Sequence, residues 1–208
     1  MPAESTAFFD WVSNRSSKQP QSLGRTAHAT VEALRPHLTR DDDVLDYGCG
    51  TGDLTIAVAE QVSAVHALDT SAGMLDVATS RANRRGVDNI TFAHSSVFDE
   101  SHRPGAFTVV TAFNILHYLE DIPEASRRIN DLLTPGGLFI SSTACLAERR
   151  SLLGMLAGLL TRLQILPDTH FLKKSELEAL ITSGGFEIVE TKDLSRLPDR
   201  FVVAKKTR

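Results

Sequence analysis

Residues 44–54 read VLDYGCGTGDL, and this stretch decides how the chain folds. Val44–Asp46 has the apolar character of a short buried strand, and glycines follow it at Gly48, Gly50 and Gly52. Apolar residues then return at helical spacing. A strand, a glycine turn and a helix in this order are typical of the first βα unit of a parallel sheet, where the turn brings the backbone close to a ligand.

Short apolar runs alternate with helical patterns along the rest of the chain, which predicts crossover connections and a mostly parallel sheet. The last two runs lie only a loop apart, so they should pair antiparallel. We therefore expect an α/β fold with helices on both faces of a seven-stranded sheet that contains one antiparallel strand. The expected strands are Val44–Asp46, Val65–Asp69, Ile90–Ala93, Phe107–Phe113, Leu138–Thr143, Phe186–Thr191 and Phe201–Lys205.

Helix boundaries are marked by turn and capping residues. Gly86 follows a helix that ends in arginines, and it should adopt a left-handed cap. A second helix is expected over Pro123–Leu133, before the turn TPGG. Ser175 and Glu178 have capping-box spacing at the start of a further helix.

Two regions interrupt this alternation within what we expect to be a single domain, residues 1–208. Residues 1–43 predict a helical cover at the N-terminus. Residues 146–170 insert a leucine-rich segment that we expect to form a lid. Both are candidates to cover the carboxyl ends of the strands, where open α/β sheets bind ligands.

The bulk composition excludes several classes of protein. The formal net charge of -4 supplies no basic field for nucleic acid or an anionic membrane. No apolar stretch reaches the ~20 residues of a membrane span, and the N-terminus does not resemble a signal peptide. Cys49 and Cys145 are too few for a disulfide framework, which favours a reducing cytoplasm. The histidines are scattered, so we expect no metal site.

Asp53 follows the glycine turn directly, at the start of the next helix. A carboxylate there suits the helix dipole, and we expect it to cap the helix. It would also repel a phosphate, which a dinucleotide fold binds at this point. The turn therefore predicts a cofactor that has no phosphate, and a positive charge on the cofactor would be compatible with Asp53.

Three motifs carry a family resemblance. VLDYGCGTG resembles the first motif of class I S-adenosylmethionine-dependent methyltransferases, ALDTSAGMLDVA their second, and LLTPGGLFISS a later one. Their order and spacing match from about residue 26 onward, and the small-molecule branch with quinone-biosynthesis methyltransferases is the most similar in general appearance. The resemblance implies a Rossmann-like sheet, S-adenosylmethionine as cofactor and methyl transfer to a small-molecule acceptor. S-adenosylmethionine is a sulfonium cation without a phosphate, as Asp53 requires.

The resemblance also implies cofactor-binding roles. Asp69, at the end of the second strand, should bind the ribose hydroxyls, although a turn cap is the plainer interpretation. Asp46 should support the cofactor's amino group or tie down its strand, two compatible roles. The remaining predicted contacts are Gly48 and Gly50 to the methionine end, Thr70 and Met74 beside the adenine, Ser96 and the Val97 backbone at the adenine edge, and Phe113 and Asn114 beside the transferable methyl. The alternative for Met74 is a core residue. Arg25, in the N-terminal cover, is a candidate partner for the cofactor carboxylate, and the alternative is a solvated surface residue.

The sequence departs from the family at Ser96, where an aspartate is common. Near the expected methyl position, His117 is a candidate general base, because an unperturbed imidazole titrates near neutrality. The alternative is a histidine bonded to local backbone. The leucines of the inserted segment lead us to hypothesise an apolar wall for a hydrophobic acceptor.

Two other functions remain open from the sequence. A nicotinamide-dependent oxidoreductase would need an open helix N-terminus, which Asp53 opposes, and a Tyr-x-x-x-Lys pair, which is absent. A regulatory subunit that binds S-adenosylmethionine without catalysis is the other. The identity of the acceptor and the oligomeric state are not determined by these motifs.

Overall fold

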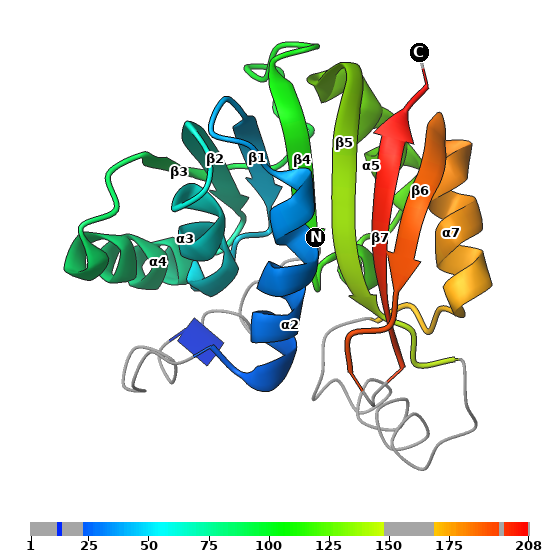
Figure 1. Ribbon diagram of the computed structural model, residues 1–208, viewed down its shortest axis with the longest axis horizontal. Coiled ribbons are helices and arrows are strands. Elements are labelled where there is room, and N and C mark those ends of the chain that lie inside the picture. The colour runs from blue at the N-terminus through cyan, green and yellow to red at the C-terminus, as the bar shows by residue number, and fades with distance from the viewer. Residues whose placement is uncertain (1–11, 14–22, 148–168, 196–197, 208) are drawn as a thin grey trace.

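The computed structural model describes residues 12–13, 23–147, 169–195 and 198–207 (Figure 1). Its centre is a seven-stranded sheet in the order β3-β2-β1-β4-β5-β7-β6. β7 is antiparallel to both of its neighbours, whereas the other pairs are parallel. This confirms the expected mostly parallel sheet with one reversed strand. The strands are β1 (Asp43–Tyr47), β2 (Ala64–Asp69), β3 (Ile90–His94), β4 (Phe107–Phe113), β5 (Leu133–Ala144), β6 (Phe186–Lys192) and β7 (Asp199–Lys206).

Helices cover both faces of the sheet (Figure 1). One face carries α2 (Arg25–Leu34), α3 (Asp53–Ala59) and α4 (Ala72–Arg85), and the other carries α5 (Ile122–Leu132) and α7 (Lys174–Ser183). Two short 3-10 helices connect elements along the chain: η1 (Arg35–His37) lies between α2 and β1, and η2 (Leu116–Tyr118) lies between β4 and α5.

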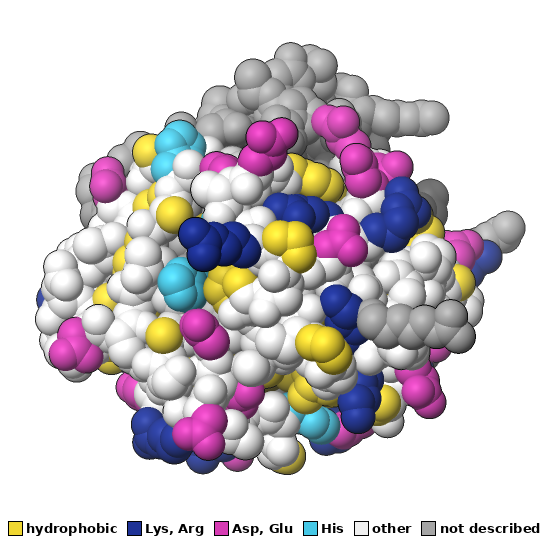
Figure 2. Space-filling view, turned by 90° about the horizontal axis from the view of Figure 1, so that it is seen from above, with side chains coloured by type: hydrophobic (Ala, Val, Ile, Leu, Met, Phe, Trp, Pro, Cys, Tyr) yellow, Lys and Arg dark blue, Asp and Glu magenta, His cyan; other side chains and the backbone are white. Residues whose placement is uncertain are grey.

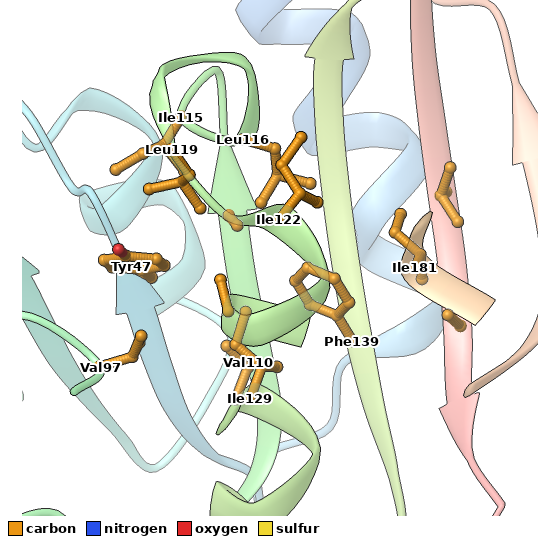
Figure 3. Close-up of a cluster of buried hydrophobic side chains, with 14 of the residues drawn as sticks. Tyr47, Val97, Val110, Ile115, Leu116, Leu119, Ile122, Ile129, Phe139 and Ile181 are labelled. Carbon is orange, nitrogen blue, oxygen red and sulfur yellow. The ribbon is translucent and has the colours of Figure 1, made fainter. Parts of the chain in front are cut away.

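The larger core cluster packs α5 and α7 against the sheet. Phe139 of β5 and Val110 of β4 project from the sheet toward Ile129 and Ile181 of these helices (Figure 3). All four side chains are buried. A second cluster lies on the opposite face, where Leu34 of α2 and Val58 of α3 are fully buried. Apolar burial on both faces explains why the central strands read as continuous hydrophobic runs.

Some of the expected helix ends match the structure and others do not. Gly86 is the C-cap of α4 with a φ of 66°, which confirms the predicted left-handed cap. The predicted capping box of α7 is wrong by two residues, because Lys173 is the N-cap and its N–H donates to Glu176. Glu178 instead pairs with Arg200 at 2.6 Å. This pair joins α7 to β7, a contact that spacing along a helix does not reveal.

The two interrupting regions are only partly described. The N-terminal region contributes α2, which packs on the sheet, and the helical residues 12–13. The predicted lid falls mainly on residues 148–168, which lie outside the described residues. Within the described ranges, no helix has both the length and the apolar character needed to cross a bilayer. Figure 2 shows basic and acidic side chains interspersed over one face of the molecule.

Candidate active site

The glycine turn between β1 and α3 depends on left-handed backbone. Gly48 has a φ of 74° and Gly50 a φ of 54°. A Cβ on Gly48 would overlap the side chain of Ile115, and the positive φ would strain any residue with a side chain. A Cβ on Gly50 would meet no atom of the described residues within 4 Å. The backbone of Gly50 is therefore open to a ligand, while Gly48 is needed for packing.

Four backbone N–H groups of this turn already have acceptors inside the protein. A phosphate-binding turn instead directs such groups at the anion. The donors and acceptors are Gly48 N to Leu68 O (2.8 Å), Cys49 N to Leu68 O (2.9 Å), Gly50 N to Asp69 Oδ2 (2.8 Å) and Gly52 N to Cys49 O (3.0 Å). The turn is therefore poorly suited to a pyrophosphate.

Asp69 ends β2 beside this turn. Its Oδ2 accepts from Gly50 N at 2.8 Å and its Oδ1 from Ser71 N at 2.9 Å. Burial raises the pKa of this carboxyl, and the backbone hydrogen bonds oppose that rise. Asp69 therefore stabilises the turn and also lines both cavities described below.

Asp46 lies deeper, at the end of β1, with 2% of its surface exposed. Its Oδ2 accepts from Thr55 Oγ1 at 2.6 Å and its Oδ1 from Thr111 Oγ1 at 2.7 Å. Burial raises its pKa, and the two hydroxyl hydrogen bonds lower it. Asp46 thereby ties β1 to α3 and β4, which is the structural role considered from the sequence.

The expectation that Asp53 caps α3 is wrong. Gly52 is the N-cap and Asp53 is the first helical residue, with no side-chain capping bond. Its Oδ2 accepts from Arg81 Nη1 at 2.6 Å and from Thr51 Oγ1 at 3.0 Å. An arginine of α4, far along the chain, thus neutralises the carboxylate at this helix start.

Two cavities meet at the glycine turn. The first has a volume of about 330 Å³ and the second about 280 Å³. They share Gly48, Asp69 and Ile115, so the two spaces adjoin. The first is lined by Val12, Ala27, Asp46, Gly48, Cys49, Gly50, Thr51, Asp53, Leu54, Asp69, Met74, Phe113, Asn114, Ile115 and Tyr118. The second is lined by Tyr47, Gly48, Asp69, Thr70, Ser96, Phe98, Ile115, Leu119, Glu120, Asp121 and Glu124.

Most of the predicted cofactor contacts come together here. The first cavity collects seven of them: Asp46, Gly48, Gly50, Asp69, Met74, Phe113 and Asn114. The second adds Thr70 and Ser96. Three predicted residues line neither cavity. Val97 is buried in the larger core cluster, Arg25 is exposed at the start of α2, and His117 is buried in η2.

Asn114 has an unusual backbone. It is the one non-glycine residue with positive φ, 56°, among the described residues, and its N–H donates to Ser142 O at 2.8 Å. Such strain persists only where surrounding structure imposes it, and it concentrates at functional sites. The conformation ends β4 at the wall of the first cavity.

His117 is 5% exposed, and its Nδ1 is buried with no hydrogen-bond partner among the residues that the structure describes. Burial, followed by the charge of nearby His170, lowers its pKa to about 4. The ring packs on Tyr118 with centroids 4.1 Å apart. The imidazole is therefore neutral at pH 7 and belongs to the packing under the cavity, while its neighbour Tyr118 lines the cavity itself.

Sequence reasoning missed several site residues. Leu54 and Tyr118 add apolar and aromatic surface to the first cavity, and Phe98, 44% exposed, lies at the second. Arg128 of α5 was also missed. It donates to the carbonyls of Val97 (2.8 Å), Asp99 (3.2 Å) and His102 (3.0 Å), and so holds the loop that carries Ser96 and Phe98. Tyr118 adjoins a singled-out residue, but no local pattern marks Arg128.

The site fits a nucleoside cofactor without phosphate. The open backbone at Gly50 and the carboxylates of Asp46 and Asp69 suit the ammonium group and the sulfonium of such a cofactor, and Asp69 lies where the two cavities adjoin. Across the described ranges, histidine, cysteine, aspartate and glutamate form no group of three that could hold a metal.

Comparison with known proteins supports this reading. A family model described as a methyltransferase domain matches residues 44–137. A ubiquinone biosynthesis O-methyltransferase from Azotobacter vinelandii is 32% identical over 161 residues, which cover 74% of this chain and 68% of that protein. An uncharacterized protein from Synechococcus sp. is 37% identical over 116 residues, but this covers 54% of this chain and only 28% of that protein.

A solved structure shows the same fold. The S-adenosylmethionine-dependent methyltransferase from Mesorhizobium loti superposes with a TM-score of 0.68 at 21% identity, covering 86% of this chain and 98% of that one. The sheet order, the glycine turn with its acidic partner and the similarity to the Azotobacter protein agree. The chain belongs to the class I S-adenosylmethionine-dependent methyltransferases.

Proposed function

We propose that this protein transfers a methyl group from S-adenosylmethionine to a small-molecule acceptor by in-line displacement. The observation that carries the proposal is the pair of adjoining cavities around a glycine turn whose N–H groups are already used internally. Such a turn disfavours a pyrophosphate and so argues against the nicotinamide-dependent alternative.

Each part of the site has a role in this proposal. Gly48 and Gly50 present backbone to the amino-acid end of the cofactor, Asp69 binds the ribose, and Thr70 and Ser96 lie beside the adenine in the second cavity. Val97 and Arg25 line neither cavity, so their predicted contacts are not part of the proposal.

The acceptor is proposed to be apolar. Leu54, Phe113 and Tyr118 give the first cavity an apolar and aromatic wall, and Ala27 of α2 adds to it. Apolar walls with a few polar groups are usual in small-molecule sites. The similarity to ubiquinone biosynthesis O-methyltransferases supports an acceptor of this kind.

Bound S-adenosylmethionine supplies an activated methyl group, so the residues of the chain mainly hold the acceptor in line and exclude water. Such positioning can contribute about 7–11 kcal/mol to the rate. The catalytic role of His117 stays a prediction, and its burial outside the cavities favours the packing role instead. A His117→Ala variant that keeps its turnover within about threefold would show that no base is supplied there.

Calorimetric titration of the full chain with S-adenosylmethionine, S-adenosylhomocysteine and NAD tests the cofactor. We expect the first two to bind and NAD to be ignored. Incubation with a methyl-labelled cofactor and a metabolite extract then tests catalysis, with label expected in small apolar products. Tight binding without transfer would favour the non-catalytic regulatory subunit, and NAD binding would overturn the proposal.

A further inference from the structure

Asp53 and Arg81 form an ion pair that has one member at the first cavity. Arg81 Nη1 lies 2.6 Å from Asp53 Oδ2, and the exposed fractions of the side chains are 6% for Arg81 and 36% for Asp53. Asp53 lines the cavity, whereas Arg81 does not. The carboxylate thus faces the ligand space while the cation that neutralises it lies inside the fold.

The surrounding packing holds Arg81 in place. α4 approaches the glycine turn so closely that a Cβ on Gly52 would lie 2.9 Å from Ala78 Cβ, one helical turn before Arg81. Arg81 Nη1 also donates to Thr51 O at 3.3 Å. Because the guanidinium is buried and fixed at two points, water and salt screen this pair less than an exposed one.

Asp53 is one of three aspartates that line the first cavity, with Asp46 and Asp69. The other two are held by hydroxyl or backbone N–H donors, which are neutral. Among the described residues that bond these three carboxylates, Arg81 alone brings a full positive charge. Arg81 therefore makes the net charge at the first cavity less negative.

We propose that Arg81 is a positioning residue that, by neutralising Asp53, sets the relative affinity of the site for S-adenosylmethionine and S-adenosylhomocysteine. This inference rests on the proposed function. The two compounds differ by a methyl group and by the positive charge on sulfur, which only S-adenosylmethionine carries. The charge of the cavity therefore changes the affinity for S-adenosylmethionine more than the affinity for S-adenosylhomocysteine. An unneutralised Asp53 would stabilise the charged sulfur before transfer more than during it, which raises the barrier.

The ratio of the two dissociation constants, measured by calorimetry on the full chain, tests the inference. Arg81→Met leaves Asp53 uncompensated and should favour S-adenosylmethionine over S-adenosylhomocysteine by roughly three- to tenfold relative to wild type. Asp53→Asn removes the negative charge at the cavity and keeps the positive charge of Arg81, so it should shift the ratio by a similar factor in the opposite direction. The double variant should return to within about twofold of wild type, because both charges are gone.

Three controls separate charge from folding. Arg84→Met removes an exposed arginine of the same helix, which bonds Ser80 Oγ at 2.6 Å, and should leave the ratio unchanged. Arg81→Lys keeps the positive charge, so its ratio of dissociation constants should stay close to that of the wild type. Asp53→Asn is nearly isosteric, so it tests the sign of the shift even where thermal denaturation shows that Arg81→Met is unfolded.

Opposite shifts in the two single variants support the inference. Affinities that fall in proportion for both compounds, or ratios that move in the same direction, would overturn it and leave the pair a structural one. A wild-type protein that binds neither compound would instead refute the proposed function on which the inference rests.

Discussion

The backbone N–H of Gly50 donates to Asp69 Oδ2 over 2.8 Å, so the side chain that ends β2 holds the turn that follows β1. The other oxygen of Asp69 accepts from Ser71, the N-cap of α4. One carboxylate thus organises two segments and lines both cavities. Replacing Asp69 should therefore weaken ligand binding more than replacing an exposed acidic residue does.

Asp69→Ala should lower the affinity for S-adenosylmethionine by about 100-fold or more. Hydrogen bonds to a charged group are each worth about 1.5–3 kcal/mol, and this substitution removes two that hold the site in addition to any made to the ligand. Calorimetry measures the affinity. Asp76→Ala, on the exposed side of α4, is the matched control and should bind normally. An Asp69→Ala affinity within threefold of wild type would contradict the assignment.

Gly50→Ala and Gly86→Ala form a second matched pair. Both glycines have left-handed φ, 54° and 66°, and a Cβ on either meets no atom within 4 Å. Each substitution should lower the free energy of unfolding by about 1–2 kcal/mol in urea titrations. Only Gly50 lines the first cavity, so only its variant should lose affinity for S-adenosylmethionine, by about tenfold. Equal binding by both variants would show that the ligand does not approach Gly50.

Arg128→Met should weaken cofactor binding without touching a cavity residue. Arg128 holds three carbonyls of the loop after β3, and this loop carries Ser96 and Phe98. We expect about a tenfold loss of affinity for S-adenosylmethionine, since those three bonds to a charged donor are lost. Hydrogen exchange should also quicken at residues 95–102.

Arg127→Met is the control for this prediction, because Arg127 is the exposed neighbour of Arg128 on α5. It should change neither the affinity nor the exchange rates. Faster exchange in Arg128→Met without a loss of affinity would mean that the loop does not contribute to binding.

His117 should make the protein sensitive to mild acid. Its pKa falls from 6.5 to about 4 on folding, so between these values the unfolded chain binds the additional proton. The contribution is fully present above about pH 6.5 and is lost as pH falls toward 4, by up to about 3 kcal/mol. In urea titrations at several pH values, His117→Gln should lose less stability over this range than wild type.

His28→Gln supplies the control for the pH titrations, because His28 is exposed on α2. Its unfolding free energy should follow the wild-type pH profile. If His117→Gln and wild type also show the same profile, the burial of His117 does not govern acid stability.

Much of the fold could be predicted from the chain alone. The alternation of apolar runs and helical patterns led to the seven strands, because a central strand buried on both faces is apolar throughout. The short connection between the last two runs led to one reversed strand, because it is too short for a crossover. The cap of α7 was predicted two residues too late, and the pairing of Glu178 with Arg200 could not be predicted because it depends on how β7 lies beside that helix.

The candidate site divides in the same way. Residues adjacent to strand ends, such as Asp46, Asp69 and Asn114, were predicted to be near the ligand and line the cavities. Arg81 and Arg128 were not predicted, because each acts on a segment about 30 residues away along the chain. Whether the predicted contacts bind the cofactor stays a prediction.

The sequence was enough to predict the order of the strands along the chain, the glycine turn and the acidic residue at the end of the second strand, since these depend on local backbone preferences and hydrophobic periodicity. The neutralisation of Asp53 by Arg81 and the burial of His117 away from the cavities became visible only in the folded protein. The reason is physical: charge pairing and desolvation depend on distances between elements, and the spacing of residues along a chain does not specify those distances.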